Sequence, residues 1–455
     1  MIEPLIVEID TKRSAYEIFS IFNHEEEVVF FDSSLEDERL GQYSFLAFNP
    51  FLTFRYKDGE VIINNNAFQG DIFEELNKIT NEYQVVNKSG LPFIGGGMGY
   101  FSYDLVRDLE KIPNLSQETL NIPTCYFNFY DTVIIYDHKQ GKVFASALGI
   151  KEVKEKSITY IIHKIMTDLV NTPFEKGLSK EIAFHSKFTK ESYIDTVEKV
   201  RQYIKNGDVY ITNLTHTFTT DIDEAPLTIY KKLRTINPAP FSAIMQLDGF
   251  NILSSSPERF LKITNGHVET RPIKGTRPRG KTIEEDERNK EALLNSEKDK
   301  SELLMIVDLE RNDLSKVCRP YTVKVEGLFE LEAYATVYHL AATIKGQLKD
   351  SCTAVDCIKA CFPGGSITGT PKIRSMQIIE ELEPTRRNIY TGCIGYLGFD
   401  GNADMNIVIR TIVEKDGQVF IGVGGGVTWE SDCLEEYQET LDKASALFAS
   451  ITQKI

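Results

Sequence analysis

The sequence has few cysteines, and none of them is arranged for a structural role. The seven cysteines are scattered over 455 residues without a CxxC pair. This spacing argues against structural zinc and against a disulfide framework. The odd count, with no secretory signal after Met1, predicts a reducing, cytoplasmic location.

Long apolar runs and an excess of positive charge are also missing. No run of 18 apolar residues is present, so no transmembrane helix is expected. The chain carries 51 Lys and Arg against 67 Asp and Glu, for a formal net charge of −16. This balance argues against nucleic acid as a partner. Any anionic substrate would therefore need local cations or a metal ion.

Nucleotide-binding fingerprints are absent as well. The glycine-rich stretch PFIGGGMGYFSYDLVRDLE (92–110) has neither a GxGxxG register nor a GK[ST] ending. It predicts a glycine-rich turn that runs into an amphipathic helix. Alternating apolar runs over the first 150 residues predict a mostly antiparallel sheet region. After this region, Thr189 is predicted to cap a helix that ends at Gly207.

One segment runs against the acidic composition. The stretch RPIKGTRPRG (271–280) holds Arg271, Lys274, Arg277 and Arg279 within ten residues. Its two prolines stiffen the backbone, and its two glycines allow close approach to a ligand. We expect a cationic loop, and the alternative is an exposed, solvated basic turn.

The residues before this loop predict a β-hairpin. Asn265-Gly266 is a strong two-residue turn signal between two short strands. This turn places Glu258 opposite Ile273, next to Lys274. The pair could be a proton donor beside a nucleophile or base. The alternative is a surface salt bridge of little energetic value.

Two predicted helices carry carboxylates on one face. Ser296 and Asp299 form a predicted capping box, and Asp299 and Glu302 are three residues apart on that helix. Near the carboxyl end, LEEYQETLDKASALF (434–448) predicts a second helix with an acidic stripe. This stripe lies beside a predicted apolar stripe of Leu434, Tyr437, Leu441, Ala444 and Phe448. Carboxylates from two helices could share Mg²⁺, which prefers oxygen ligands. The alternative is ordinary acidic pairs on exposed helices.

Two further features suit a carboxylate ligand. The segment MNIVIRTIV predicts a strand that carries Arg410, and VFIGV ends in Gly424-Gly425-Gly426. An arginine fork beside adjacent glycine amides can bind a carboxylate. The segment PGGSITGTPKIR (363–374) predicts a loop leading into a helix with Thr370 at the N-cap and Pro371 at N1.

Several of these segments together resemble the chorismate-utilising family, which includes the large subunits of anthranilate synthase and aminodeoxychorismate synthase. The resemblance rests on SSSPERF (254–260), PIKGTRPRG, SELLMIVDLERND and EYQETLDKA, together with the PFxGGxxGYxxYD stretch. It implies an α+β fold of two large twisted antiparallel or mixed sheets packed as a sandwich, with helices outside. An amino-terminal region (1–180) and a chorismate-binding catalytic region (181–455) would interleave in one compact fold.

The resemblance also implies roles for individual residues. Lys274 would be the nucleophile and Glu258 the acid. Glu302 and Glu439 would bind Mg²⁺, with Asp299 and Glu436 in the outer shell. Substrate-binding roles would fall to Thr276, His339, Tyr390, Arg410, Gly424, Gly425, Gly426 and Lys443.

Lys274 decides which reaction is expected. PIKGT resembles the aminodeoxychorismate synthase version of this loop, whereas anthranilate synthases usually carry alanine there. The expected reaction makes 4-amino-4-deoxychorismate from chorismate and ammonia, on the route to 4-aminobenzoate and folate. Water-adding relatives have a lysine base near the position of Ile211, and isoleucine cannot activate water. Ammonia-using relatives usually have glutamine there, so Ile211 departs from their pattern as well. Anthranilate synthase component I is the alternative. A non-catalytic, tryptophan-sensing protein would have lost the magnesium residues, which are all present.

The ammonia is expected to come from another chain. A glutamine amidotransferase needs a cysteine in a GxCxG-type turn, and no cysteine of this sequence lies in one. The cysteines are Cys125, Cys318, Cys352, Cys357, Cys361, Cys393 and Cys433. We therefore expect a heterodimer with a separate glutamine amidotransferase subunit.

The family binds tryptophan at a place occupied here by FDSS (31–34) and GQYSFL (41–46). The matching residues are Ser33, Tyr43, Ser44, Pro240, Phe241 and Ser242. The match is loose, and the sequence favours the alternative that these are ordinary strand and turn residues.

Overall fold

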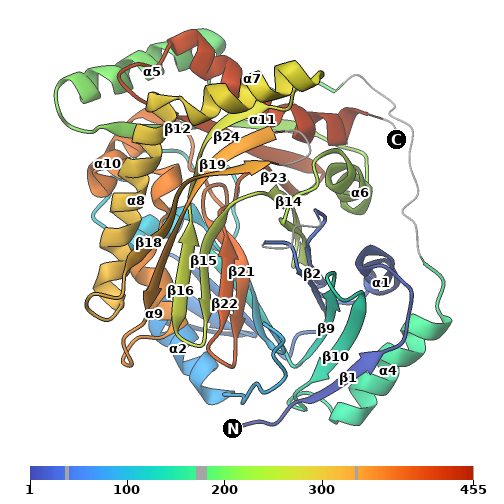
Figure 1. Cartoon of the computed structure of the whole chain (residues 1–455). Coiled ribbons are helices and arrows are strands. Elements are labelled where there is room, and N and C mark those ends of the chain that lie inside the picture. Colours follow the sequence, from blue (N-terminus) through green and yellow to red (C-terminus); the bar gives the residue numbers. More distant parts are fainter. Residues whose placement is uncertain (36–39, 171–181, 334–336, 454–455) are drawn as a thin grey trace.

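The chain folds into two large antiparallel sheets surrounded by helices (Figure 1). The computed structural model describes residues 1–35, 40–170, 182–333 and 337–453. Each sheet has 12 strands. Within each sheet, every described pair of neighbouring strands is antiparallel. The expected α+β sandwich with helices outside is confirmed.

The first sheet combines strands from the beginning, the middle and the end of the chain. Its order is β1 (Leu5–Ile9), β10 (Lys142–Ala147), β9 (Thr132–Asp137), β3 (Tyr43–Ala47), β2 (Val29–Asp32), β13 (Phe241–Leu247), β14 (Phe250–Ser256), β23 (Thr411–Lys415), β24 (Gln418–Val427), β12 (Ile211–Asp221) and β11 (His185–Ser186), with β20 (Gly369–Thr370) paired to β12.

The second sheet is built in the same mixed way from early and late strands. Its order is β17 (Ile273–Pro278), β19 (Val337–Gln347), β16 (His267–Arg271), β15 (Arg259–Thr264), β22 (Ala403–Asn406), β21 (Cys393–Gly398), β7 (Gly96–Phe101), β8 (Cys125–Tyr130), β4 (Leu52–Lys57), β5 (Glu60–Ile63) and β6 (Asn66–Gln69), with β18 (Lys324–Ala333) paired to β19. Both sheets thus take strands from both sides of residue 180. The boundary expected at that residue lies outside the described residues.

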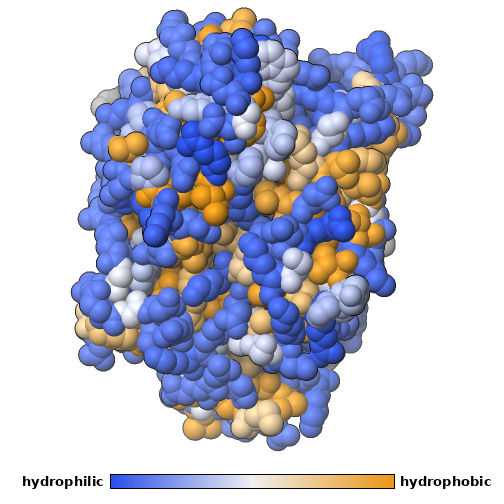
Figure 2. All heavy atoms as spheres, turned by 90° about the vertical axis from the view of Figure 1, so that its left-hand side faces the viewer, coloured by the Kyte–Doolittle hydropathy of each residue, from blue (hydrophilic) through white to orange (hydrophobic). Residues whose placement is uncertain are grey.

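Helices cover the outer faces of the sheets. They are α1 (Ala15–Phe22), α2 (Ile72–Glu82), α3 (Val106–Leu109), α4 (Lys154–Thr167), α5 (Lys190–Lys205), α6 (Pro226–Ile236), α7 (Ile283–Leu294), α8 (Glu297–Val317), α9 (Ala354–Cys361), α10 (Lys372–Leu382) and α11 (Cys433–Thr452). None of the described helices has the length and apolar character needed to cross a membrane. The face shown in Figure 2 is mostly hydrophilic and is broken by apolar patches.

The main core lies between the two sheets. One buried cluster joins Phe45 and Met245 of the first sheet to Phe54 and Phe127 of the second. A second cluster lies on the outer face of the first sheet, where α1, α4, α6 and α11 pack. Burial of this apolar surface is the main driving force for the fold.

Two of the places where the chain passes from one sheet to the other lie next to each other. Pro257 and Glu258 join β14 to β15, and residues 407–410 join β22 to β23. The two crossings are bonded together, because Ile407 donates its N–H to the Glu258 carbonyl at 2.9 Å. The Ser255 N–H donates likewise to the Arg410 carbonyl at 3.0 Å.

The glycine-rich stretch is not the predicted turn and long helix. Gly96–Phe101 is β7, a fully buried strand inside the second sheet. The helix after it, α3, has only four residues. Glycine is required in this strand, because a Cβ on Gly99 would lie 2.0 Å from the Tyr126 carbonyl oxygen of β8.

Several local predictions also need correction. Helix α10 has Pro371 as its N-cap rather than Thr370, which belongs to β20. Ser296 caps α8 as expected, but the Asp299 carboxylate pairs with Arg277 instead of closing a capping box. Helix α5 begins after Thr189 and forms as predicted.

We expect Gly99→Ala to lower the free energy of unfolding by about 3 kcal/mol, because the new methyl group would collide with backbone and force β7 away from β8. The midpoint of urea-induced unfolding measures this effect. Gly70→Ala is the matched control, since its Cβ would meet only side-chain atoms, the nearest at 3.3 Å. An equal loss in both variants would contradict this account of β7.

Candidate active site

The crossing from β14 to β15 brings Glu258 near Lys274. The hairpin β15–β16 forms with its turn at Asn265-Gly266, both at positive φ. One carboxylate oxygen of Glu258, Oε1, accepts from the Ile273 N–H at 3.4 Å. Burial raises the pKa of the Glu258 carboxyl, and the Ser366 hydroxyl and the Lys274 ammonium partly offset that rise. A buried carboxyl with a raised pKa is suited to donate a proton.

The cationic segment is mainly a strand rather than a loop. Residues 273–278 form β17, which pairs with β19. Arg271 is buried and bonded to Glu330 and Glu332. Arg277 pairs with Asp299 at 2.9 Å, and Arg279 pairs with Asp286 at 2.7 Å.

Lys274 is held differently from these three arginines. Its ammonium donates to the Ser366 carbonyl at 2.9 Å, and no carboxylate in the described part of the chain forms a salt bridge with it within 4.0 Å. Three of the four cations are therefore neutralised by acids from elsewhere in the fold. Lys274 is left as the cation of this segment that faces the Glu258 carboxyl.

Thr276 and His339 lie together across the β17–β19 pair. The Thr276 hydroxyl and His339 Nδ1 are 2.9 Å apart, and Nδ1 lies 3.3 Å from the Gly275 carbonyl. Burial lowers the pKa of His339 to about 4, so the imidazole is neutral at neutral pH. A neutral imidazole can donate from one nitrogen and accept at the other.

Carboxylates from α8 and α11 converge beside this pair. Glu302 is buried, and burial raises the pKa of its carboxyl; Lys274 opposes the rise, whereas Glu439 adds to it. Burial also raises the pKa of Glu436 to about 6, with Glu439 again adding to the rise. Glu439 is bonded to Lys443 at 2.5 Å and keeps about half of its side chain exposed. Two helices thus direct acids toward one region.

This region fits a hard divalent cation in its chemistry. Glu436 Oε2 is buried without a hydrogen-bond partner among the described residues, and the Glu439 carboxylate helps to raise the pKa of Glu302. In the part of the chain that the structure describes, no group of three or more His, Cys, Asp or Glu side chains is placed so that it could hold a metal ion by itself. Magnesium sites of one or two carboxylates completed by substrate oxygens and water need no such group.

The glycine triplet of β24 separates the acidic helix from Lys274. A Cβ on Gly425 would lie 3.1 Å from Glu436 Oε2 and 3.5 Å from Glu439 Oε1. A Cβ on Gly426 would lie 3.5 Å from Lys274 Nζ. Because successive strand residues face opposite sides, these glycines let functional groups approach β24 from both faces.

Lys443 and Arg410 close another side of the site. The Lys443 ammonium donates to the Gly424 carbonyl at 2.8 Å, and the Arg410 guanidinium donates to the Lys443 carbonyl at 2.6 Å. Arg410 does not lie within a strand as predicted, but at the end of the crossing between β22 and β23 with φ at 53°. Burial lowers the pKa of its guanidinium, with the nearby Tyr390 and Glu439 opposing that change.

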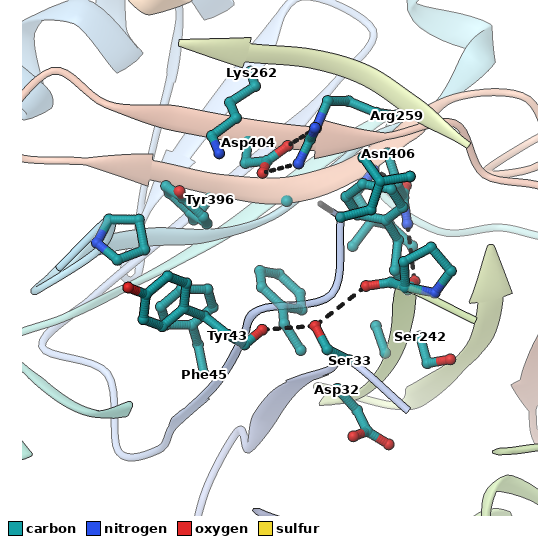
Figure 3. A pocket seen from close by; sticks show the side chains of 18 of the residues that line it. Asp32, Ser33, Tyr43, Phe45, Ser242, Arg259, Lys262, Tyr396, Asp404 and Asn406 are labelled. Carbon is teal, nitrogen blue, oxygen red and sulfur yellow. Dashed lines mark hydrogen bonds and ion pairs between the residues drawn. The ribbon is translucent and has the colours of Figure 1, made fainter. Parts of the chain in front are cut away.

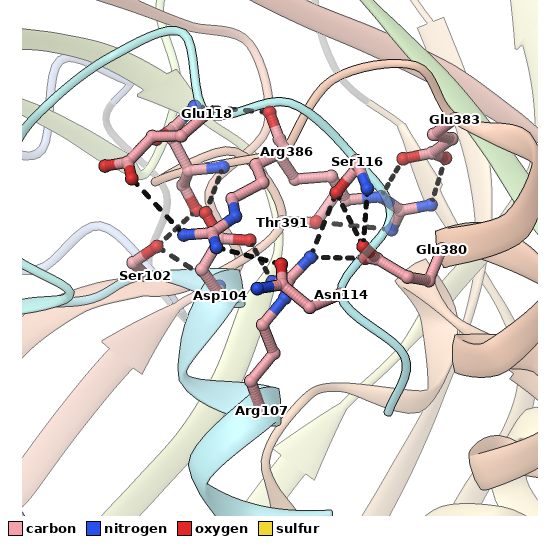
Figure 4. A network of polar contacts seen from close by, with 12 residues as sticks. Ser102, Asp104, Arg107, Asn114, Ser116, Glu118, Glu380, Glu383, Arg386 and Thr391 are labelled. Atoms are coloured by element: carbon pink, nitrogen blue, oxygen red, sulfur yellow. Dashed lines mark hydrogen bonds and ion pairs between the residues drawn. The ribbon is translucent and has the colours of Figure 1, made fainter. Parts of the chain in front are cut away.

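Tyr390 is fixed by a polar network that sequence reasoning did not find (Figure 4). Arg107 pairs with Glu380, whose carboxylate also accepts from the Leu115 and Ser116 N–H groups. Arg387 bonds Glu383 and the carbonyls of Ile367 and Asn213. The network ties the segment after β7 to the loop that ends at Tyr390. The arginines of EPTRRN are its only sequence signal.

The helix α11 faces the site differently from the predicted apolar stripe. That stripe was Leu434, Tyr437, Leu441, Ala444 and Phe448. Leu434 is instead 51 % exposed, whereas Glu436 and Thr440 are buried. The helix turns its acids toward β24, so its pattern reflects the site as well as the core.

The residues predicted for a tryptophan pocket do surround a cavity (Figure 3). Its volume is about 710 Å³, including space open to solvent. Ser33, Tyr43, Pro240, Phe241 and Ser242 line it. Ser44 lies behind the wall, where its hydroxyl accepts from the Ser33 N–H at 3.0 Å. Five of the six predicted residues therefore line one cavity.

Comparison with known proteins agrees with this geometry. A family model for chorismate binding enzymes matches residues 27–449. The chain belongs to this family. It is therefore an enzyme chain of the chorismate-utilising type, and its specific reaction is not fixed by membership.

The relatives carry two different names. Aminodeoxychorismate synthase component 1 of Bacillus subtilis is 38% identical, over 91% of this chain and 90% of that protein. Anthranilate synthase component 1 of Acetivibrio thermocellus is 36% identical, over 91% and 88%. The crystal structure of anthranilate synthase component I from Streptococcus pneumoniae matches with a TM-score of 0.81 and 30% identity, over 91% of this chain and 93% of that one.

Proposed function

We propose that this chain makes 4-amino-4-deoxychorismate from chorismate and ammonia. The observation that carries the proposal is Lys274, which lies beside the buried Glu258 carboxyl and next to the glycine strand at Gly426. Lysine at this position resembles the aminodeoxychorismate synthase form of the loop. Anthranilate synthase remains the second candidate, because relatives of both names have similar identity.

The dicarboxylate substrate would be bound by the cations and donors around β24. Arg410 and Lys443 supply positive charge, and His339 with Thr276 supplies neutral hydrogen-bonding groups. Tyr390 would limit the depth of the site, since it packs against Gly422. Glu302 and Glu439 would hold Mg²⁺, with Asp299 and Glu436 around them. A bound Mg²⁺ supplies charge neutralisation for a substrate carboxylate.

The chemistry would proceed through Lys274 in two displacements. The neutral amine forms a bond to C2 of the ring, the double bond shifts, and the C4–O bond breaks. Glu258 gives its proton to the departing hydroxyl, which leaves as water. Ammonia then bonds to C4, the double bond shifts back, and the C2–N bond to Lys274 breaks. The proton that the Lys274 nitrogen loses after bonding to C2 returns to Glu258, and the proton that ammonia loses at C4 passes to the Lys274 nitrogen, which departs as a neutral amine.

Ile211 is consistent with this assignment. It begins β12, is buried, and its Cδ1 would lie 3.1 Å from a Cβ at Gly426. An aliphatic side chain at this place supplies no base to activate water. The ammonia would come from a glutamine amidotransferase subunit in a heterodimer. Both named relatives are called component 1, which agrees with a two-component enzyme.

The cavity of Figure 3 is proposed as the tryptophan site of this chain. Its wall includes Arg259, whose guanidinium makes two hydrogen bonds to Asp404 at 3.0 and 3.1 Å. Arg259 directly follows Glu258 in the sequence.

A covalent intermediate tests the role of Lys274. Chorismate and Mg²⁺ without ammonia should leave an adduct on the chain, heavier by chorismate minus water, which peptide mass spectrometry would place at Lys274. Lys274→Ala should lack this adduct and turn over chorismate at least about 10-fold more slowly. An enzyme that forms product normally and never shows the adduct would remove Lys274 from the chemistry.

Magnesium dependence tests the acidic pair. Glu302→Gln should lose magnesium-dependent turnover, because a carboxamide is a weaker ligand for a hard cation than a carboxylate. Titration of turnover against Mg²⁺ measures the change. Glu297→Gln is the control on the same helix, because Glu297 is 88% exposed. Unchanged magnesium dependence in Glu302→Gln would show that the metal is held elsewhere.

A further inference from the structure

Glu310 is a buried acid on α8 that the proposed chemistry does not use. It lies two helical turns beyond Glu302 and is 8% exposed. Its Oε2 lies 2.9 Å from the Thr270 hydroxyl. A Cβ on Gly365 would lie 3.6 Å from its Cγ. Glu310 thus packs beneath the segment that carries Ser366, whose carbonyl accepts from Lys274.

The direction of the hydrogen bonds around Thr270 depends on the form that Glu310 takes. The Thr270 hydroxyl has one proton and two oxygen neighbours: the Phe260 carbonyl at 2.7 Å and Glu310 Oε2 at 2.9 Å. A carbonyl oxygen can only accept. If Thr270 donates to Phe260, the second contact is a hydrogen bond only when Glu310 is protonated and donates to Thr270.

The charged groups that face Glu310 also disfavour its ionised form. Two carboxyl groups lie close enough to raise its pKa: Glu258, in the crossing between β14 and β15, and Asp313, on α8. The facing cation is Lys372 of α10, whose three N–H groups already serve Asp313 and the carbonyls of Cys361 and Pro363. Burial, opposed by Thr270 and reinforced by Glu258, raises the pKa of Glu310 to about 8.

The Phe260 carbonyl connects this acid to the active site. The pairing of β15 with β16 is interrupted by a bulge between Arg259 and Lys262. Phe260 lies in the bulge, two residues after Glu258, and its carbonyl is held by Thr270. When Glu310 is protonated, the order of donation runs from Glu310 through Thr270 to the strand that fixes Glu258.

We propose that Glu310 is a positioning residue that stays protonated, donates to Thr270, and so holds β15 and the adjoining Glu258 in place. The proposal rests on the proposed role of Glu258 as the acid. Ionisation of Glu310 would break the donated hydrogen bond and place an anion toward Glu258. Both changes would impair turnover in alkaline solution.

A direct measurement of the Glu310 proton does not depend on activity. Infrared spectra of the full chain, with its glutamates labelled with carbon-13, should show a protonated-carboxyl band at neutral pH that disappears in Glu310→Gln. In the wild type this band should fade as the pH is raised above about 8. Absence of any band assignable to Glu310 would overturn the proposal, and the wild-type titration holds even if the variant fails to fold.

The pH dependence of turnover distinguishes positioning from a passive structural role. Glutamine at position 310 can donate to Thr270 and never ionises. The ratio of wild-type to Glu310→Gln turnover of chorismate with saturating ammonia, normalised at about pH 7, should fall by about fivefold or more by about pH 9.5. The ratio cancels the ionisation of ammonia itself. The same ratio for Glu297→Gln should stay constant.

The outcomes separate this inference from the proposed function. A flat ratio for Glu310→Gln would overturn the positioning role, whatever the product is. A wild-type chain that makes a product other than aminodeoxychorismate, but shows the infrared band and the falling ratio, would leave Glu310 assigned and the proposed reaction wrong.

Discussion

The active site depends on two adjacent places where the chain leaves one sheet and joins the other. These crossings run side by side and are bonded to each other, from the Ile407 N–H to the Glu258 carbonyl and from the Ser255 N–H to the Arg410 carbonyl. One crossing carries Glu258 and the other carries Arg410. Neither residue lies in a regular strand, because each is located where the chain passes from one sheet to the other. The acid and the arginine are thereby set at one edge of the sandwich.

An acidic chain can form a site for an anionic substrate when some of its cations are not paired with its own carboxylates. Arg271, Arg277 and Arg279 are bonded to acids of other elements, so they stabilise β17 and its surroundings. Lys274 is bonded to a carbonyl instead. Burial raises the pKa of the carboxyls of Glu258, Glu302 and Glu436. The site therefore carries less negative charge than its composition suggests.

Local sequence signals predicted those features that local physics determines. The Asn265-Gly266 turn formed its hairpin, because both positions can adopt positive φ. Thr189 began α5, because its hydroxyl accepts a free N–H at the start of the helix. The resemblance to the family supplied the two sheets, and it selected site residues that the fold brings near one another, such as Lys274 and Glu258.

Features set by distant parts of the chain were missed. Gly96–Phe101 looks like a turn, but its glycines serve a central strand whose neighbours leave no room for side chains. The alternation around Arg410 suggests one strand, yet the chain changes sheets there. The partners of Arg271 lie about 60 residues further along the chain. No local sequence pattern indicates a role for Glu310, because that role depends on its contact with Thr270 and on the bulge that follows Glu258.

The identity of the product tests the central claim most directly. The purified chain would be given chorismate, Mg²⁺ and an ammonium salt, with and without added aminodeoxychorismate lyase. The account predicts that 4-aminobenzoate and pyruvate appear only when the lyase is present. Anthranilate and pyruvate formed without the lyase would contradict it, and would make this chain an anthranilate synthase despite its lysine at position 274.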